Sequence, residues 1–163
     1  MAGKRDLYSH LGFFNALRPQ ATAITTEGAT INIREFDQVA MVVEVNSFLS
    51  LLGSVEKYEL ILEHATVSVG GVDQWSVVPN SLLIHSVQGG LKATGETGIF
   101  ETINSASDIG TYFVGYRGDA NHGYLRLKIS ATASETLSVA RMVFSGTAVL
   151  GSKHLWPVNV SVT

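Results

Sequence analysis

Short apolar runs, broken by turn residues about every ten positions, constrain this chain more than any other feature. Thr, Val, Ile and Gly recur along its whole length. In residues 57–69 the side chains fall on two faces, with Tyr58, Leu60, Leu62 and His64 on one and Glu59, Ile61, Glu63 and Ala65 on the other. This period of two is typical of strands with one buried face. The regular spacing of such runs predicts an all-β sandwich or barrel.

The composition indicates one domain with apolar surface that needs to be buried. The chain has 163 residues, of which 45% are hydrophobic and only 15% are charged, below the roughly 25% charged that soluble domains usually carry. We therefore expect a single-domain antiparallel β-sandwich, jelly-roll-like, over residues 21–151. An extended N-terminal arm over residues 1–20 and a C-terminal tail over residues 152–163 complete the expected organisation.

The expected arm has two possible local structures. Leu7, Leu11, Phe14 and Leu17 fall at helical spacing, but Gly12 weakens a helix there. An extended segment is equally consistent with the sequence. In either case the apolar side chains need a cover, and deletion of residues 1–17 is expected to leave a soluble fold.

Two stretches predict particular strands. Residues 39–45, "VAMVVEV", are nearly all apolar, as a central strand covered on both faces would be. Residues 111–130 predict a hairpin with Arg126 and Lys128 pointing outward. The Arg-Gly-Asp tripeptide at residues 117–119 is known from cell adhesion. It is better explained as part of the turn of this hairpin, because short motifs recur by chance. The side chains expected to face the core from the hairpin are Phe113, Leu125, Leu127 and Ile129.

Several function classes are disfavoured by what the sequence lacks. There is no cysteine, so thiolate metal sites, thiol nucleophiles and disulfides are excluded. The net charge of −3 gives no basic surface for nucleic acid. None of the histidines has metal-ligand spacing, and no phosphate-binding loop occurs. No apolar run is long enough for a transmembrane helix. We expect no metal, no cofactor, no nucleic-acid or membrane partner, and assembly in a host cytoplasm.

Carboxylates and aromatic residues leave two further alternatives open. Glu59 and Glu63 can project from one sheet face, as in a glycosidase, although such pairs are more often part of a solvated surface. Trp75 and Trp156 could stack on sugars, although aromatic residues of β-sandwiches are more often core or interface residues. No nucleophile motif is present. We do not expect an enzyme.

Motifs near both ends of the chain resemble a known group. Residues 5–11, "RDLYSHL", match an opening "K-D-L-Y-S-N-L", and residues 112–118, "YFVGYRG", match "Y-x-V-G-Y-x-G". "YLR" (124–126) and "AVLG" (148–151) match the later "R-Y-V-R-V" and "A-V-L-G-H-P". These patterns resemble small β-rich proteins encoded near the major capsid gene of tailed bacteriophages. The chain departs from the group at "GSKH", where a His-Pro pair is usual, and at the longer turn "DANHG".

The resemblance implies a structural virion protein. Several members of the group are capsid decoration, or cement, proteins, which bind across major capsid protein subunits and stabilise the icosahedral head. It implies a location on the outer capsid surface and a homo-oligomer, either a dimer or a trimer. Aromatic and apolar residues at the two ends are the expected contacts with neighbours. These interface candidates are Leu7, Tyr8, Leu11, Phe13, Phe14, Leu17, Leu155 and Trp156.

Two alternatives compete with this interpretation. A head–tail connector or tail component would share the β-rich fold and the gene neighbourhood. A carbohydrate-binding jelly-roll module would use exposed aromatic residues on one face of the sandwich.

Overall fold

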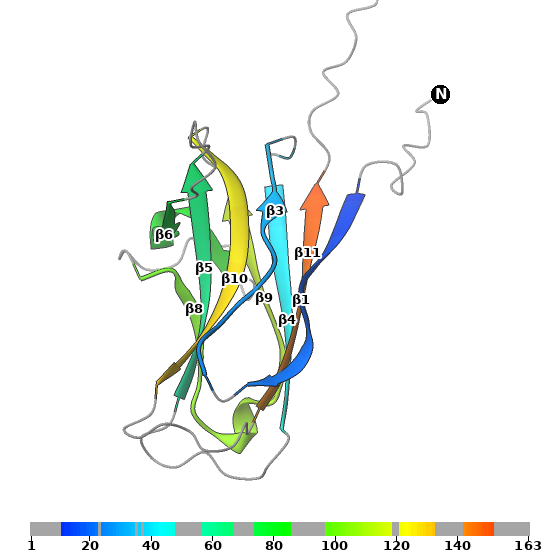
Figure 1. Cartoon of the computed structure of the whole chain (residues 1–163), viewed down its shortest axis with the longest axis vertical. Helices are drawn as coiled ribbons and strands as arrows, with labels where there is room; N and C mark the ends of the chain where they lie inside the picture. The colour runs from blue at the N-terminus through cyan, green and yellow to red at the C-terminus, as the bar shows by residue number, and fades with distance from the viewer. Residues whose placement is uncertain are drawn as a thin grey trace, which may run out of the picture.

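Two antiparallel β-sheets packed face to face form this protein (Figure 1). The computed structural model describes residues 11–22, 24–34, 36, 38–47, 57–66, 74–85, 97–118, 121–132 and 142–151. Within them, the five-stranded sheet has the order β1-β11-β4-β9-β7, and the six-stranded sheet the order β2-β10-β5-β6, with β3 also on β10 and β8 also on β5.

The strands of the five-stranded sheet are β1 (Leu11–Thr22), β4 (Gln38–Ser47), β7 (Leu83–His85), β9 (Gly110–Arg117) and β11 (Met142–Gly151). Those of the six-stranded sheet are β2 (Thr26–Glu27), β3 (Ile31–Asn32), β5 (Lys57–Thr66), β6 (Trp75–Val77), β8 (Ile99–Ile103) and β10 (His122–Thr132). Two short 3₁₀ helices, η2 (Asn80–Leu82) and η3 (Ala106–Asp108), lie in the connections.

The strand order is that of a jelly roll. β2 and β3 share one position beside β10, and β6 and β8 share one position beside β5. The chain passes between the sheets from β1 to β2, from β3 to β4, from β4 to β5, and then at every connection from β6 to β11. Two interleaved Greek keys produce this order. The all-β, jelly-roll-like sandwich expected from the sequence is confirmed.

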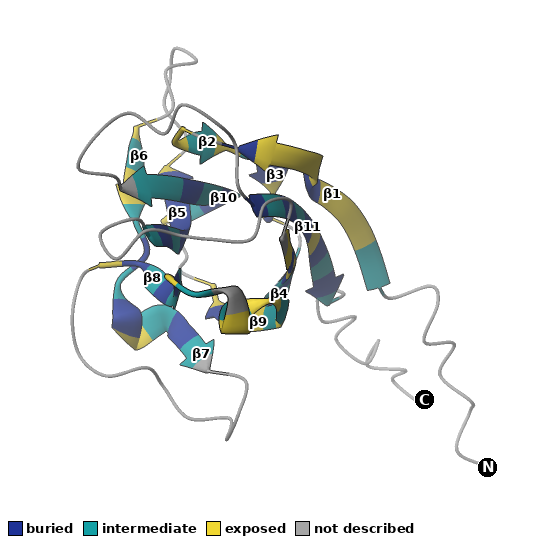
Figure 2. Ribbon diagram, turned by 90° about the horizontal axis from the view of Figure 1, so that it is seen from below, coloured by how far each residue is buried: buried dark blue, intermediate teal, exposed yellow. Residues whose placement is uncertain are grey.

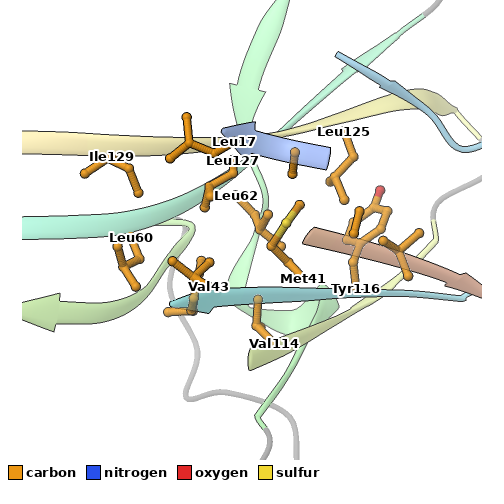
Figure 3. Packing of buried hydrophobic residues seen from close by; sticks show 14 of the residues in the cluster. Leu17, Met41, Val43, Leu60, Leu62, Val114, Tyr116, Leu125, Leu127 and Ile129 are labelled. Carbon is orange, nitrogen blue, oxygen red and sulfur yellow. The ribbon is translucent and has the colours of Figure 1, made fainter. Parts of the chain in front are cut away.

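The core lies between the two sheets (Figure 3). Met41 and Val43 of β4 point into it from one side, and Leu60 and Leu62 of β5 from the other. Each of these four side chains is 0% exposed. Burial of such a side chain stabilises the folded state by about 1.5–3 kcal/mol. Inward-facing residues of both sheets therefore share one core.

The predicted hairpin over residues 111–130 is not present. β9 pairs with β4 and β7, whereas β10 pairs with β5, β2 and β3. The two strands belong to different sheets, so the segment between them is a crossover.

The inward face of β10 was predicted correctly, but that of β9 was not. Leu125, Leu127 and Ile129 are fully buried, and Arg126 and Lys128 lie on the outer face. Phe113, expected in the core, is 50% exposed, and its neighbours Val114 and Tyr116 are buried instead. β9 carries aromatic or apolar residues on both faces, so its own pattern does not define the inward one.

Residues 11–22 are extended and form β1, so the helical alternative does not apply to this part of the expected arm. β1 pairs with β11 at one edge of the five-stranded sheet. Residues 1–10 and 152–163, which include Leu7, Tyr8, Leu155 and Trp156, lie outside the described residues.

Candidate interaction site on the edge strand and the outer sheet face

The edge strand β1 is irregular. Its register with β11 shifts between Asn15 and Leu17 and again between Leu17 and Gln20, each time by one extra residue on β1. Pro19 follows the first bulge and removes one backbone donor. Bulges and proline are common on edge strands because they prevent uncontrolled strand pairing.

The inner side of β1 is anchored in the core. Ala16 and Leu17 are 0% and 5% exposed. The carbonyl of Ala16 accepts a hydrogen bond of 2.7 Å from the amide of Ala29. Gly146 of β11 leaves the space that Leu17 and Leu127 fill, since a Cβ there would lie 2.7 Å from a methyl group of Leu127. Deletion of residues 1–17 would remove two core residues, contrary to the expectation that this segment is dispensable for folding.

Two phenylalanines of β1 are exposed to solvent, and as adjacent strand residues they project from opposite faces of the sheet edge. Phe13 is 66% exposed and Phe14 is 45% exposed, and β1 is coloured mostly as exposed in Figure 2. Both line an open hollow with a volume of about 260 Å³. Its other lining residues are Asn15, Leu17, Pro19, Ser145, Gly146 and Thr147. Exposed aromatic rings beside a hollow are typical of protein contact sites.

The interface candidates thus separate into distinct places. Phe13 and Phe14 are on the surface, Leu11 is half-buried, and Leu17 is in the core, where it holds the strand in place. The other four candidates lie outside the described residues.

The outer face of the five-stranded sheet is apolar at its centre. Register places Phe13, Val149, Ala40, Gly115 and Ile84 in one row across the sheet. Sequence reasoning missed this face as a candidate site. The signal was present in the continuous apolar run of residues 39–45, which predicts cover on both sides of β4. A second row, offset by two residues along each strand, contains Asn15, Thr147, Val42 and Phe113.

The outer face of the six-stranded sheet is charged. Arg126 donates to Glu63 Oε2 at 2.7 Å and, through its two terminal nitrogens, to Glu27 at 2.7 and 2.9 Å. Lys128 Nζ contacts Glu63 Oε1 at 2.8 Å. Burial raises the pKa of the Glu63 carboxyl, but hydrogen bonds and charge from Lys128 and Arg126 outweigh this effect. The pKa of Glu63 therefore lies below its usual value of 4.5.

The two glutamates considered for glycoside chemistry do lie on one face of β5, and both are paired with cations. Lys57 Nζ is 2.6 Å from Glu59 Oε1, and both oxygens of Glu63 are engaged. A general acid needs a raised pKa, and that of Glu63 is lowered. The Arg126 guanidinium lies 4.3 Å from the centre of the Trp75 ring, so one face of that ring is already occupied.

A buried polar contact joins the two sheets. Nδ1 of His64 and the hydroxyl of Tyr116 share a hydrogen bond of 3.1 Å, and the His64 ring stacks on His122 with centres 3.5 Å apart. His64 is 3% exposed, so it is a hydrogen-bonded core histidine.

The described residues show neither a metal-ligand cluster nor a membrane-spanning helix. They contain no group of three or more His, Asp or Glu side chains placed to hold a metal ion. Nor do they contain a helix of the length and apolar character that crossing a membrane requires.

The sequence matches no protein-family model and no curated protein sequence. Among solved structures, the crystal structure of the SPBc2 prophage-derived protein YomS is similar to this chain, with a TM-score of 0.42 and 11% sequence identity. The similarity covers 85% of this chain and 92% of that protein. An identity of 11% does not transfer a function from one protein to the other.

Proposed function

We propose that this protein is a structural protein of a tailed-phage virion, a decoration or cement protein that binds across major capsid protein subunits. In this role it acts as a homo-oligomer on the outer surface of the icosahedral head and stabilises the shell. No chemical step is part of the proposed role.

The observation that carries this proposal is the pair of exposed phenylalanines on β1. Phe13 and Phe14 are two of the residues that line a hollow of about 260 Å³, on a strand that Ala16 and Leu17 fix in the core. A rigid aromatic anchor loses little conformational entropy on binding, so such residues supply much of the affinity of protein interfaces.

The resemblance to phage head proteins adds support through the location of its motif residues. Residues 148–151 of β11 pair directly with residues 11–14 of β1, where the opening motif ends. Tyr112, Val114, Gly115 and Tyr116 form half of β9 in the same sheet. Two of the shared motifs, at residues 112–118 and 148–151, therefore lie in the sheet that carries Phe13 and Phe14.

The proposed mechanism is cooperative attachment. A shell subunit seam offers several identical contact points, and an oligomer that engages two or three of them binds more tightly than any single contact would allow. The rigid β-sandwich keeps those contacts at fixed distances, so outward movement of one shell subunit is resisted by its neighbours.

The test is attachment of purified protein to shells assembled from the major capsid protein of the phage that encodes it. Phe13→Ala combined with Phe14→Ala is expected to weaken attachment at least tenfold, consistent with about 1–2 kcal/mol per anchor. The matched control is Ile24→Ala, because Ile24 is also 65% exposed but lies away from the hollow. Equal attachment by the double variant and the control would contradict the proposal.

The number of copies per particle separates decoration from the connector alternative. A decoration protein is expected in hundreds of copies, comparable to the shell protein, by quantitative mass spectrometry of purified particles. A count of roughly six or twelve, as expected of a closed ring at one vertex, would favour a connector or tail component.

A further inference from the structure

We infer that the outer face of the five-stranded sheet binds the same face of a second copy of this chain, in a twofold dimer with its strands reversed. This surface is centred on β4 and β9 and differs from the hollow beside β1. The inference concerns free protein and does not depend on attachment to a shell.

The first observation is the missing cover on β4. Val39, Met41, Val43 and Val45 fill the core, and the intervening residues Ala40 and Val42 are apolar as well. Beside them on the same outer face, Phe113 is 50% exposed. Surface strands of antiparallel sandwiches usually alternate polar residues outward, as β10 does in the opposite sheet with Arg126 and Lys128. An apolar outer face in one sheet and a charged one in the other indicates that only the first is an interface.

The second observation is that large and small residues on this face alternate in a self-complementary way. Register pairs Met41 with Val114. The proposed twofold axis lies parallel to the sheet and crosses the strands at the level of Met41 and Val114. Rotation about it exchanges the row that contains Ala40 with the row that contains Val42. Phe113 of one copy then lies over Gly115 of the other, and Val42 lies over Ala40. Gly115 has no side chain, and Ile84 packs beside it at 3.1 Å from the position of a Cβ, which forms a flat apolar seat for the incoming ring.

The third observation is charge complementarity under the same rotation. Glu44 lies three positions beyond Met41 in one direction, and Arg117, paired with Gln38, lies three positions beyond it in the other. Both are exposed on the outer face. The rotation brings Glu44 of each copy to within one strand spacing of Arg117 of the partner, a distance that the long arginine side chain spans. Each charge is thus close to its opposite at both ends of the apolar centre.

The area is that of a small dimer interface. With strands ~4.8 Å apart and ~3.4 Å per residue, β4, β7, β9 and β11 cover roughly 500 Å² per copy, less than the roughly 800 Å² per partner of a standard interface and in the range of weakly associating pairs. Packed sheets are each twisted and cross at about 30°, so contact is closest at β4 and β9. The edge strand β1 stays at the rim, where the hollow beside Phe14 remains open to other partners.

The test is sedimentation equilibrium of the purified full-length chain from about 1 to 100 μM, with a charge-exchange series. Glu44→Arg and Arg117→Glu are each expected to raise the dimer dissociation constant at least tenfold. Combining them is expected to restore it to within about threefold of the original, because the rotation brings the exchanged charges together again. Phe113→Ala is expected to weaken the dimer at least tenfold.

Three outcomes would overturn the inference. They are a monomer at all these concentrations, a trimer, and a dimer that the Glu44 and Phe113 substitutions leave unchanged. A trimer counts against it because a threefold ring cannot join one face to itself. Ser130→Glu, on the outer face of the six-stranded sheet, is the control and is expected to leave association unchanged. Far-UV circular dichroism shows that each variant is folded. Because no shell is present, these results are separate from the attachment assay.

Discussion

At the residue scale, Gly28 is fixed by the close approach of two strands. A Cβ on it would lie 2.4 Å from the carbonyl oxygen of Ala16 and 2.9 Å from that of Leu127. Its own amide donates to the Leu127 oxygen at 2.7 Å. Gly28 lies between β2 and β3, and it therefore lets the chain pass close to β1 and β10 while Gly28 bonds to Leu127 and Ala29 bonds to Ala16.

Gly28→Ala is expected to reduce the free energy of unfolding by about 1–3 kcal/mol, the usual cost of forcing atoms into a packed site. Urea unfolding followed by tryptophan fluorescence measures it. Gly110→Ala is the control, because nothing lies within 4 Å of a Cβ there, and its effect is expected within about 0.5 kcal/mol. Equal effects of the two substitutions would show that the position of Gly28 has room for a side chain.

The Glu63 network gives a pH-dependent contribution to stability. Because the pKa of Glu63 is lowered in the folded protein, its contribution is present above the ordinary carboxyl pKa and is lost as the pH falls through the folded value. Glu63→Gln is expected to cost about 1–3 kcal/mol at pH 7, and the difference from the original protein is expected to shrink by pH 3.

Chemical unfolding of both proteins at pH 7 and pH 3 measures this difference. The comparison variant is Glu59→Gln, whose partner Lys57 is far more exposed than Arg126, so less than 1 kcal/mol is expected at either pH. A Glu63→Gln deficit that stays constant across this range would argue against a contribution from the charge.

At the element scale, β1 has a structural side and an exposed side. Leu17→Ala is expected to destabilise the fold by about 2–4 kcal/mol because it opens a cavity in the core. Phe13→Ala, at a position 66% exposed, is expected to change stability by less than about 0.5 kcal/mol. Thermal unfolding of both variants tests this division, and a large loss on Phe13→Ala would mean that its ring supports the domain.

Also at this scale, the strand pairing of β9 and β10 differs from the hairpin that their local sequence pattern predicts. The turn-rich residues between them are equally suited to a hairpin and to a crossover, since both need a change of direction. β9 instead pairs with β4, which precedes it by more than sixty residues. Over residues 125–129, β10 alternates between large apolar and charged residues, and its inward face was therefore predictable.

At the scale of the whole molecule, both sheets depend on one core. Leu127 is 0% exposed and lies at the level of Gly146 and Leu17, so it connects strands from both sheets. Leu127→Asp places an unpaired charge in the core, at a cost of several kcal/mol. The whole free energy of unfolding of a typical domain is about 5–15 kcal/mol. We expect the variant to lose both the β-strand signal in circular dichroism and the tryptophan fluorescence change on unfolding. A partly folded variant would contradict a single cooperative unit.

The sequence alone determined that the chain is all β, that it forms a sandwich, and which residues of β5 and β10 face inward. Alternation is a local property, and it needs no knowledge of partners. Tertiary structure alone decided that β1 closes against β11, that Phe113 faces outward, and that the apolar outer side of β4 forms a surface. The reason is that a strand with apolar residues on both sides has no intrinsic inner face, and only the strands that flank it and the sheet that packs on it select one.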